Sequence, residues 1–176
     1  EDFVYYLPFV GSFMYRVGGV RASQDNAERL LQKDHLVAVF PEGVKGIGKP
    51  FSKRYQLQRF GRGGFVKLAI RTGTPIIPVA VIGAEETHPL LYKSGILAKP
   101  FGIPFVPITA TLPWFGLAGL FGLPTKWSLY FGKPIDVTKY GPAAVDDDLL
   151  IHKISEEVRS TIQEMLVEGL KKRRSI

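Results

Sequence analysis

The sequence contains no cysteine, so it can form no disulfide, thiolate nucleophile or zinc–thiolate site. It begins without a methionine and without the charged-then-apolar pattern of a signal peptide. A dense apolar run over residues 5–14 follows almost at once, and such a run is typical of buried sequence. We therefore expect these 176 residues to be an N-terminally incomplete part of a longer chain.

One stretch of the chain lacks acidic residues, and another lacks charged residues altogether. Residues 43–84 contain no Asp or Glu, and residues 100–125 contain no charged residue of either sign. The whole sequence has 23 Lys and Arg against 16 Asp and Glu, a net charge of +7. This excess favours an anionic partner, which could be a nucleic acid, a membrane surface or a phosphorylated small molecule.

The apolar runs predict an α/β fold. Hydrophobic residues make up 45% of the chain, and we interpret residues 1–176 as a single domain with a real core. Residues 36–40 and 76–82 have the continuous apolar pattern of buried strands, and residues 127–131 predict a third strand. A helix over 64–71 between the first two strands gives a βαβ unit, so we expect a mostly parallel central sheet flanked by helices.

Three further helices are expected. Residues 5–17 have the composition of a short apolar helix, and Ser23 is a plausible N-cap for a helix over 24–33. The last helix is amphipathic, with one apolar residue in every four, and could be either docked on the sheet or a basic tail that touches a membrane. Its apolar positions are Leu150, Ile154, Val158, Ile162, Leu166 and Leu170.

The segment Phe40-Pro41-Glu42-Gly43 directly follows the first expected strand. Loops at the carboxyl ends of parallel strands are where open α/β sheets bind ligands. Proline stiffens the turn, glutamate supplies an ionised acceptor, and glycine lets a ligand approach the backbone. Pro-Glu-Gly is also an ordinary turn sequence, so the segment alone does not decide.

Eight cations interleaved with glycines follow that turn, with no acid among them. Such a segment near a helix N-terminus favours phosphate binding by two or three of the cations, and the rest would form a solvated basic face. The eight are Lys45, Lys49, Lys53, Arg54, Arg59, Arg62, Lys67 and Arg71.

The order of these segments resembles the phospholipid/glycerol acyltransferase superfamily, in its lysophosphatidate-acyltransferase form. Phe40-Pro41-Glu42-Gly43 is similar to the third block of that family, which helps to bind the phosphate or glycerol end of the acceptor. The helix at 63–69 follows, and Ile77-Pro78-Val79 is similar to the fourth block. The resemblance covers residues 11–140 and implies substrate binding by Phe40, Pro41, Glu42, Gly43, Lys45 and Arg21.

The sequence departs from the family pattern at two places. The second block usually ends in an Arg, and Arg21 lies one position from the aligned place. The first block, His-x-x-x-x-Asp, holds the catalytic base, but the residues five positions after His35, His88 and His152 are Phe40, Lys93 and Glu157. No catalytic residue is therefore visible in this chain, which alone is expected to be inactive, and we expect the dyad upstream of residue 1.

The resemblance implies transfer of a fatty acyl group from a CoA or carrier-protein thioester to a glycerol-phosphate, lysophospholipid or related lipid hydroxyl. It implies no cofactor and no metal; acyl-CoA or acyl-carrier protein is the co-substrate. The expected partners are the thioester donor, a phosphorylated glycerolipid acceptor and an anionic membrane surface, with membrane association on the cytoplasmic face. The alternative is a non-enzymatic lipid-binding module of the same fold.

The uncharged stretch 100–125 is long enough to cross a membrane, but Pro104, Pro107 and Pro113, together with four glycines, argue against one straight helix. We expect a broken segment at the membrane interface or along an acyl-chain groove, the alternatives being an internal loop or a true span. No nucleic-acid-binding motif accompanies the basic residues, so we expect no nucleic-acid partner. The residues expected to enter the membrane or groove are Trp114, Phe115, Leu117, Leu120 and Phe121.

Overall fold

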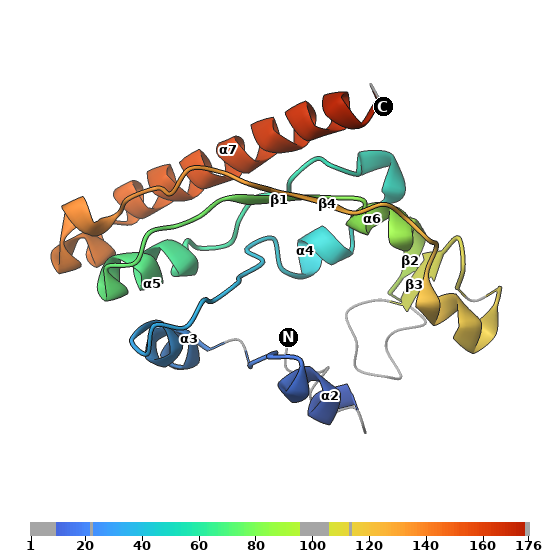
Figure 1. Cartoon of the computed structure of the whole chain (residues 1–176), viewed down its shortest axis with the longest axis horizontal. Helices are drawn as coiled ribbons and strands as arrows, with labels where there is room; N and C mark the ends of the chain where they lie inside the picture. Colours follow the sequence, from blue (N-terminus) through green and yellow to red (C-terminus); the bar gives the residue numbers. More distant parts are fainter. Residues whose placement is uncertain (1–9, 22, 96–105, 113, 175–176) are drawn as a thin grey trace.

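The computed structural model describes residues 10–21, 23–95, 106–112 and 114–174 (Figure 1). Helices dominate it, and its four strands form two separate antiparallel pairs. The α-helices are α2 (Val10–Arg16), α3 (Gln24–Leu31), α4 (Val44–Ile47), α5 (Gly64–Thr72), α6 (Ala84–Thr87) and α7 (Asp148–Arg174). The strands are β1 (Val79–Ile82), β2 (Leu90–Ser94), β3 (Val106–Thr109) and β4 (Ser128–Phe131). The 3-10 helices are η1 (Phe51–Lys53), η3 (Gly116–Phe121), η4 (Thr138–Tyr140) and η5 (Pro142–Asp146).

The helices expected from the sequence are present. The Ser23 hydroxyl accepts a hydrogen bond from the Asn26 amide at 3.1 Å and caps α3, which ends two residues earlier than expected. Gly73 closes α5 in the left-handed conformation at φ 64°, which glycine adopts without a steric penalty. The expected helix over 5–17 is α2; residues 5–9 lie outside the described part of the chain.

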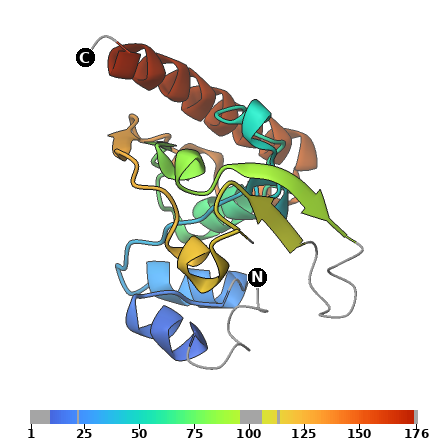
Figure 2. The ribbon, with the colours of Figure 1, turned by 90° about the vertical axis from the view of Figure 1, so that its right-hand side faces the viewer.

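The long helix α7 runs across one face of the β1–β4 pair (Figures 1 and 2). Ala80 and Ile82 of β1 are fully buried under it, together with Leu166 of α7. The helix comes so close that a side chain at Gly169 would meet Ile82 and Tyr130 at 2.6 and 2.8 Å. The expectation of a docked amphipathic helix is confirmed, since the apolar positions from Leu150 to Leu170 are all buried or half-buried.

A second part of the core lies between α5 and the first half of α7. Val66 and Ile70 of α5 pack with Ile151, Ile154 and Val158 of α7. Burying an aliphatic side chain of this size contributes about 1.5–3 kcal/mol each to folding. The helices α5 and α7 therefore form a stable base for the loop that joins α4 to α5.

The prediction of a mostly parallel central sheet is wrong. β1 pairs with β4 in antiparallel register, Val79 opposite Phe131 and Ile82 opposite Ser128, and β2 pairs with β3, also antiparallel. The strands at 76–82 and 127–131 were located to within a few residues, and Pro78 precedes β1 as its missing N–H requires. The error lay in direction and partner, because an apolar run indicates burial but does not specify the neighbouring strand.

The prediction of a strand over residues 36–40 is also wrong. The segment forms no regular element; Leu36 is fully exposed and Phe40 is 82% exposed. Among the described residues no strand pairs with it. Without a paired strand, the side chains of Leu36 and Phe40 are not covered.

Candidate functional site

The Phe40–Gly43 segment forms a tight turn that leads into α4. The Gly43 amide donates to the Phe40 carbonyl at 3.1 Å, and Gly43 itself has φ 56°. Two hydrogen bonds attach this turn to residues 58–61: the Gln58 amide donates to Glu42 Oε1 at 2.6 Å, and the Gly61 amide donates to the Pro41 carbonyl at 3.2 Å. The turn is thus held at a fixed place beside a second backbone segment.

The Glu42 carboxylate lies against α4 as well as against Gln58. A Cβ atom at Gly46 would collide with Glu42 Oε2, and it would lie 2.8 Å from Glu42 Cβ. A carboxylate accepts about four hydrogen bonds, and the Gln58 amide uses one of them. Glu42 therefore has an internal role as an anchor and retains acceptor capacity toward a ligand hydroxyl.

The other residues expected to bind substrate lie in two places. Phe40 and Lys45 are exposed and adjoin the Glu42 turn. Arg21 is exposed and lies just before α3, where its carbonyl accepts a hydrogen bond from Asn26 Nδ2 at 3.3 Å. The structure thus groups residues 40–45 in one turn and places Arg21 on a separate segment.

Half of the eight interleaved cations are engaged in the fold. Lys49 pairs with Glu85 and Lys67 with Asp148, each at 2.9 Å. Arg54 lies 4.5 Å from the centre of the Phe51 ring, and Arg71 donates to Gln24 at 3.5 Å. Within the described part of the chain, no ion pair or hydrogen bond engages the other four side chains: Lys45, Lys53, Arg59 and Arg62.

A shallow open concavity of about 480 Å³ lies against the first half of α7. It is lined by Arg59 from the loop and by His152, Glu156 and Arg159 from α7. Arg159 donates to Glu156 through Nε and Nη2, both at 2.9 Å. Arg59 directly follows Gln58, whose amide holds Glu42, and its side chain lines this concavity. Sequence reasoning included Arg59 among eight cations but missed His152 and Arg159, which share a helix face at i and i+7.

A buried polar cluster holds the loop between α4 and α5. Tyr55 has a positive φ of 62°, which is strained for a bulky residue, and it is 7% exposed. Its hydroxyl donates to Glu86 Oε1 at 2.7 Å and accepts from the Gly83 amide at 2.9 Å. Arg173, near the end of α7, donates to both oxygens of Glu86 at 2.8 Å.

Glu85 completes the cluster on the loop side. It accepts from the Tyr55 amide at 2.9 Å and pairs at 2.9 Å with Lys49, whose side chain is 3% exposed. The Lys49 ammonium also donates to the Gln56 carbonyl at 2.9 Å. A buried ammonium is costly without such partners, so Lys49 serves structure rather than ligand binding.

The cluster shifts the pKa values of its members in opposite directions. Burial raises the pKa of the Tyr55 hydroxyl, and the hydrogen bond to Glu86 raises it further. Burial disfavours the charged form of Glu86, but hydrogen bonds from Arg173 and Tyr55 outweigh this and lower its pKa. Glu86 is thus held ionised and Tyr55 neutral.

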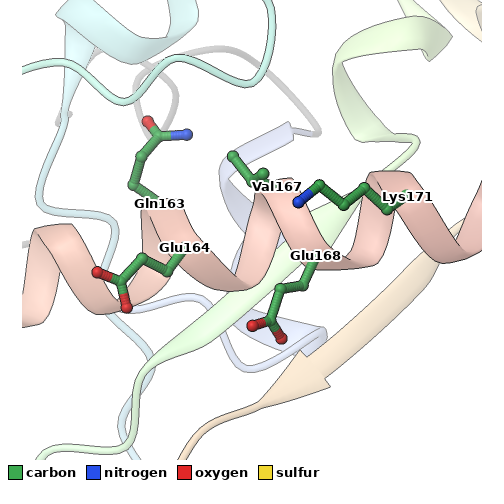
Figure 3. Close-up of a pocket in the computed structure, with 5 residues that line it drawn as sticks. All are labelled: Gln163, Glu164, Val167, Glu168 and Lys171. Carbon is green, nitrogen blue, oxygen red and sulfur yellow. The ribbon is translucent and has the colours of Figure 1, made fainter.

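Gln163 connects the same loop to the middle of α7. Its Oε1 accepts from the Leu57 amide and its Nε2 donates to the Tyr55 carbonyl, both at 2.8 Å. Figure 3 shows Gln163 projecting from one side of α7 and Glu164 and Glu168 from the other. These residues, with Val167 and Lys171, line a second concavity of about 310 Å³ that contains none of the substrate-binding residues expected from the sequence.

The expected membrane or acyl-groove residues are strongly exposed where the structure describes them. Trp114 is 72% exposed, Phe115 67% and Phe121 88%. Leu117 and Leu120 lie in η3, but their side chains are outside the described part of the structure. In the described chain no helix is both long enough and apolar enough to cross a bilayer.

The general acyltransferase family model matches residues 2–82, which contain the Glu42 turn, α5 and β1. The first half of the chain is thus similar to the acyltransferase family. The resemblance to the phospholipid/glycerol acyltransferase superfamily is thereby confirmed. No solved structure gives a significant match.

Curated relatives extend the similarity over almost the whole chain. An uncharacterized protein of Mycobacterium tuberculosis is 46% identical over 175 residues, which is 99% of this chain and 49% of the relative. A Mycobacterium leprae protein has the same identity over 48% of its own length. A Gallus gallus protein named DGAT1/2-independent enzyme synthesizing storage lipids is 24% identical over 97% of this chain and 46% of its own. The chain thus spans about half the length of the curated relatives that it matches.

Proposed function

We propose that the complete gene product is an O-acyltransferase. It moves a fatty acyl group from a CoA or carrier-protein thioester to a hydroxyl of a glycerol phosphate, a lysophospholipid or a related lipid alcohol. The observation that carries this proposal is the Glu42 turn, fixed by the Gln58 and Gly61 amides, in a segment that matches the acyltransferase family. The printed name of the Gallus gallus relative, an enzyme synthesizing storage lipids, supports a lipid acceptor.

In the proposed reaction the acceptor hydroxyl oxygen attacks the thioester carbonyl. The new C–O ester bond replaces the C–S bond, and the departing thiolate takes up the proton that the hydroxyl loses. The family assigns the proton transfer to a His-x-x-x-x-Asp block, which the 176 residues do not contain. We assign residues 40–45 to acceptor binding, where Glu42 orients a hydroxyl and the nearby cations attract a phosphate.

Lys45, Arg59 and Arg62 are the cations proposed to attract that phosphate. They are exposed, they have no ion-pair partner among the described residues, and they flank the turn or its supporting segment. Arg21 is a more distant candidate from the segment before α3. Lys49 and Lys67 are excluded from this role because their ammonium groups already pair with carboxylates.

A thioester-release assay with acyl-CoA and lysophosphatidate tests the proposal. We expect release by the complete gene product and none by residues 1–176 alone. In the complete protein, Glu42→Ala should lower kcat/KM for the acceptor by about 10- to 100-fold, the loss of one charge-assisted contact. Glu164→Ala, an exposed glutamate on α7, is the matched control.

We further propose that the protein works at an anionic membrane surface on the cytoplasmic face, with Trp114, Phe115 and Phe121 in the interface. These exposed side chains occur in a stretch without charge, in a sequence with net charge +7. In flotation with phosphatidate-containing vesicles, Trp114→Ala should weaken binding about tenfold, the loss of one buried aromatic contact. The other tryptophan, Trp127, donates its indole N–H to Thr87 and Thr125, so Trp127→Ala is the control.

The same vesicle assay addresses the second candidate function, a non-enzymatic lipid-binding module. The three exposed aromatic residues favour membrane contact whether or not catalysis occurs. Vesicle binding together with absent thioester release by the complete gene product would support this module and reject the acyltransferase. Equal binding of neutral and anionic vesicles would reject the role of the positive charge.

A further inference from the structure

The side chain of Gln163 connects Tyr55 to Leu57, the neighbour of the residue that holds Glu42. The Tyr55 amide is fixed by Glu85 and its carbonyl by Gln163. The Leu57 amide donates to the same Gln163 side chain, and the next amide along the chain, that of Gln58, donates to Glu42. A displacement of Tyr55 would therefore be passed on within three residues to the Glu42 carboxylate.

The Tyr55 backbone cannot hold this position by itself. A positive φ is unfavourable for a residue with a bulky side chain, and it persists only where surrounding contacts enforce it. Here the contacts are the Glu85 and Glu86 carboxylates, the Gly83 amide and, behind Glu86, the forked pair with Arg173. The strain is thus maintained by α6 and by the last turns of α7.

Burial gives these contacts their strength. Tyr55 and Lys49 are each 7% exposed, so water does not replace a lost partner readily. Arg173 binds both oxygens of Glu86, and such a bidentate geometry fixes direction as well as distance. A lysine at that position would keep the charge but not the fork.

We propose that Glu85, Glu86 and Arg173 are positioning residues for acceptor binding, which act through Tyr55 and the loop 49–60 to place Glu42. This inference rests on the proposed function. The inference gives the end of α7 a role in the geometry of the Glu42 turn, although this end lies about ninety residues after β1 in the sequence. It also predicts that perturbing this end of α7 changes acceptor recognition more than donor recognition.

Two measurements on the complete gene product test the inference. The first is hydrogen–deuterium exchange of the amides of residues 55–61, which should become about tenfold faster in Tyr55→Phe, because the two hydrogen bonds of the Tyr55 hydroxyl are lost. The second is acyl-transfer kinetics, in which KM for the acceptor should rise about five- to tenfold while KM for acyl-CoA stays unchanged. Glu86→Gln should show the same pattern.

Matched variants separate positioning from simple destabilisation. Arg173→Ala should raise the acceptor KM. Arg173→Lys should raise it less, because the positive charge is kept. Tyr140→Phe removes a half-buried tyrosine hydroxyl beside the other part of the core and should leave both measurements unchanged.

The outcomes distinguish this inference from the proposed function. Unchanged exchange of residues 55–61 in Tyr55→Phe, or faster exchange with an unchanged acceptor KM, would overturn the positioning role alone. Equal increases of KM for acceptor and donor would also overturn it, because they would indicate a general loss of structure. Absence of acyl transfer by the wild-type gene product would overturn the proposed function and this inference together.

Discussion

Glu42 is a structural anchor, and we also propose that its carboxylate binds the acceptor. The Gln58 amide occupies part of its carboxylate, and α4 passes so closely that only glycine fits at position 46. The position of the carboxylate is therefore set by backbone atoms on two sides. Such preorganisation reduces the entropy lost when an acceptor binds.

Gly46→Ala is expected to displace Glu42, because the added Cβ collides with Glu42 Oε2 and lies close to its Cβ. Alanine favours helix over glycine by about 0.8–1 kcal/mol, so α4 itself should persist. We expect the acceptor KM of the complete gene product to rise about tenfold, one lost charge-assisted contact, with the donor KM unchanged. Gly95→Ala, where a Cβ meets nothing within 4 Å, is the control. Equal acceptor KM values in the two variants would contradict the role given to Gly46.

The Tyr55–Glu86 pair predicts a loss of stability at both ends of the pH range. Glu86 has a lowered pKa in the fold, so its contribution is complete above its ordinary value of 4.5 and is lost as the pH falls through the lower folded value. Tyr55 has a raised pKa, so its contribution is complete below its ordinary value of 10.0 and is lost as the pH rises through the higher folded value. Urea unfolding at a series of pH values should show Glu86→Gln flattening the acid limb and Tyr55→Phe the alkaline limb. Parallel curves for all three proteins would refute this assignment.

The sequence identified the turn residues but not the residues that hold them. Phe-Pro-Glu-Gly is visible as a local pattern, and the acid-free run after it pointed to the cations. Tyr55, Glu86 and Arg173 are separated by 31 and 87 residues, so no local spacing signals their contact. The sequence offers one hint of them, the pair of adjacent acids after Gly83, and such a pair is also typical of a solvated turn.

Among the elements, α7 does most to unite the fold. It covers β1 and β4 with its second half and packs on α5 with its first half. Its apolar period, its acidic start and its basic end were all legible in the sequence, because helix periodicity and end charges are local properties. Strand partners are non-local, which is why β1 and β4 were located but their antiparallel pairing was not, and β2 and β3 were not predicted.

Ile154→Ala tests the weight of α7 in the fold. Ile154 is 2% exposed between α5 and α7, and deleting a buried aliphatic side chain of this size costs about 2–4 kcal/mol. Leu149 on the same helix is 85% exposed, and Leu149→Ala should change stability by no more than about 0.5 kcal/mol. The free energies of unfolding in urea give the comparison, and similar values for both variants would contradict the assigned core.

At the scale of the whole molecule, the fold separates a well-packed half from an uncovered one. α5, α7 and the inner face of β1–β4 make the core, whereas Leu129 and Phe131 on the outer face of β4 are 56% and 71% exposed. Composition correctly indicated a chain with a core, and the family resemblance agrees with the acyltransferase family model that matches residues 2–82. The antiparallel pairing of the strands was not predictable from these residues, because the direction of pairing depends on which strands meet.

The exposed segment 36–40 has a consequence for how the isolated chain behaves in concentrated solution. It forms no regular element, is uncharged, and contains two β-branched residues and one aromatic residue, a composition typical of segments that stack into intermolecular sheets. We expect the 176-residue chain to self-associate with rising concentration and to bind an amyloid dye, and Val39→Lys to suppress both by placing a charge in the stack. Leu149→Lys, at an apolar site on α7 that is 85% exposed against 49% for Val39, should not suppress them, and sedimentation velocity over a hundredfold concentration range would show the difference. The uncovered segment 36–40 would then make the isolated chain prone to aggregate, and a low protein concentration would reduce this self-association.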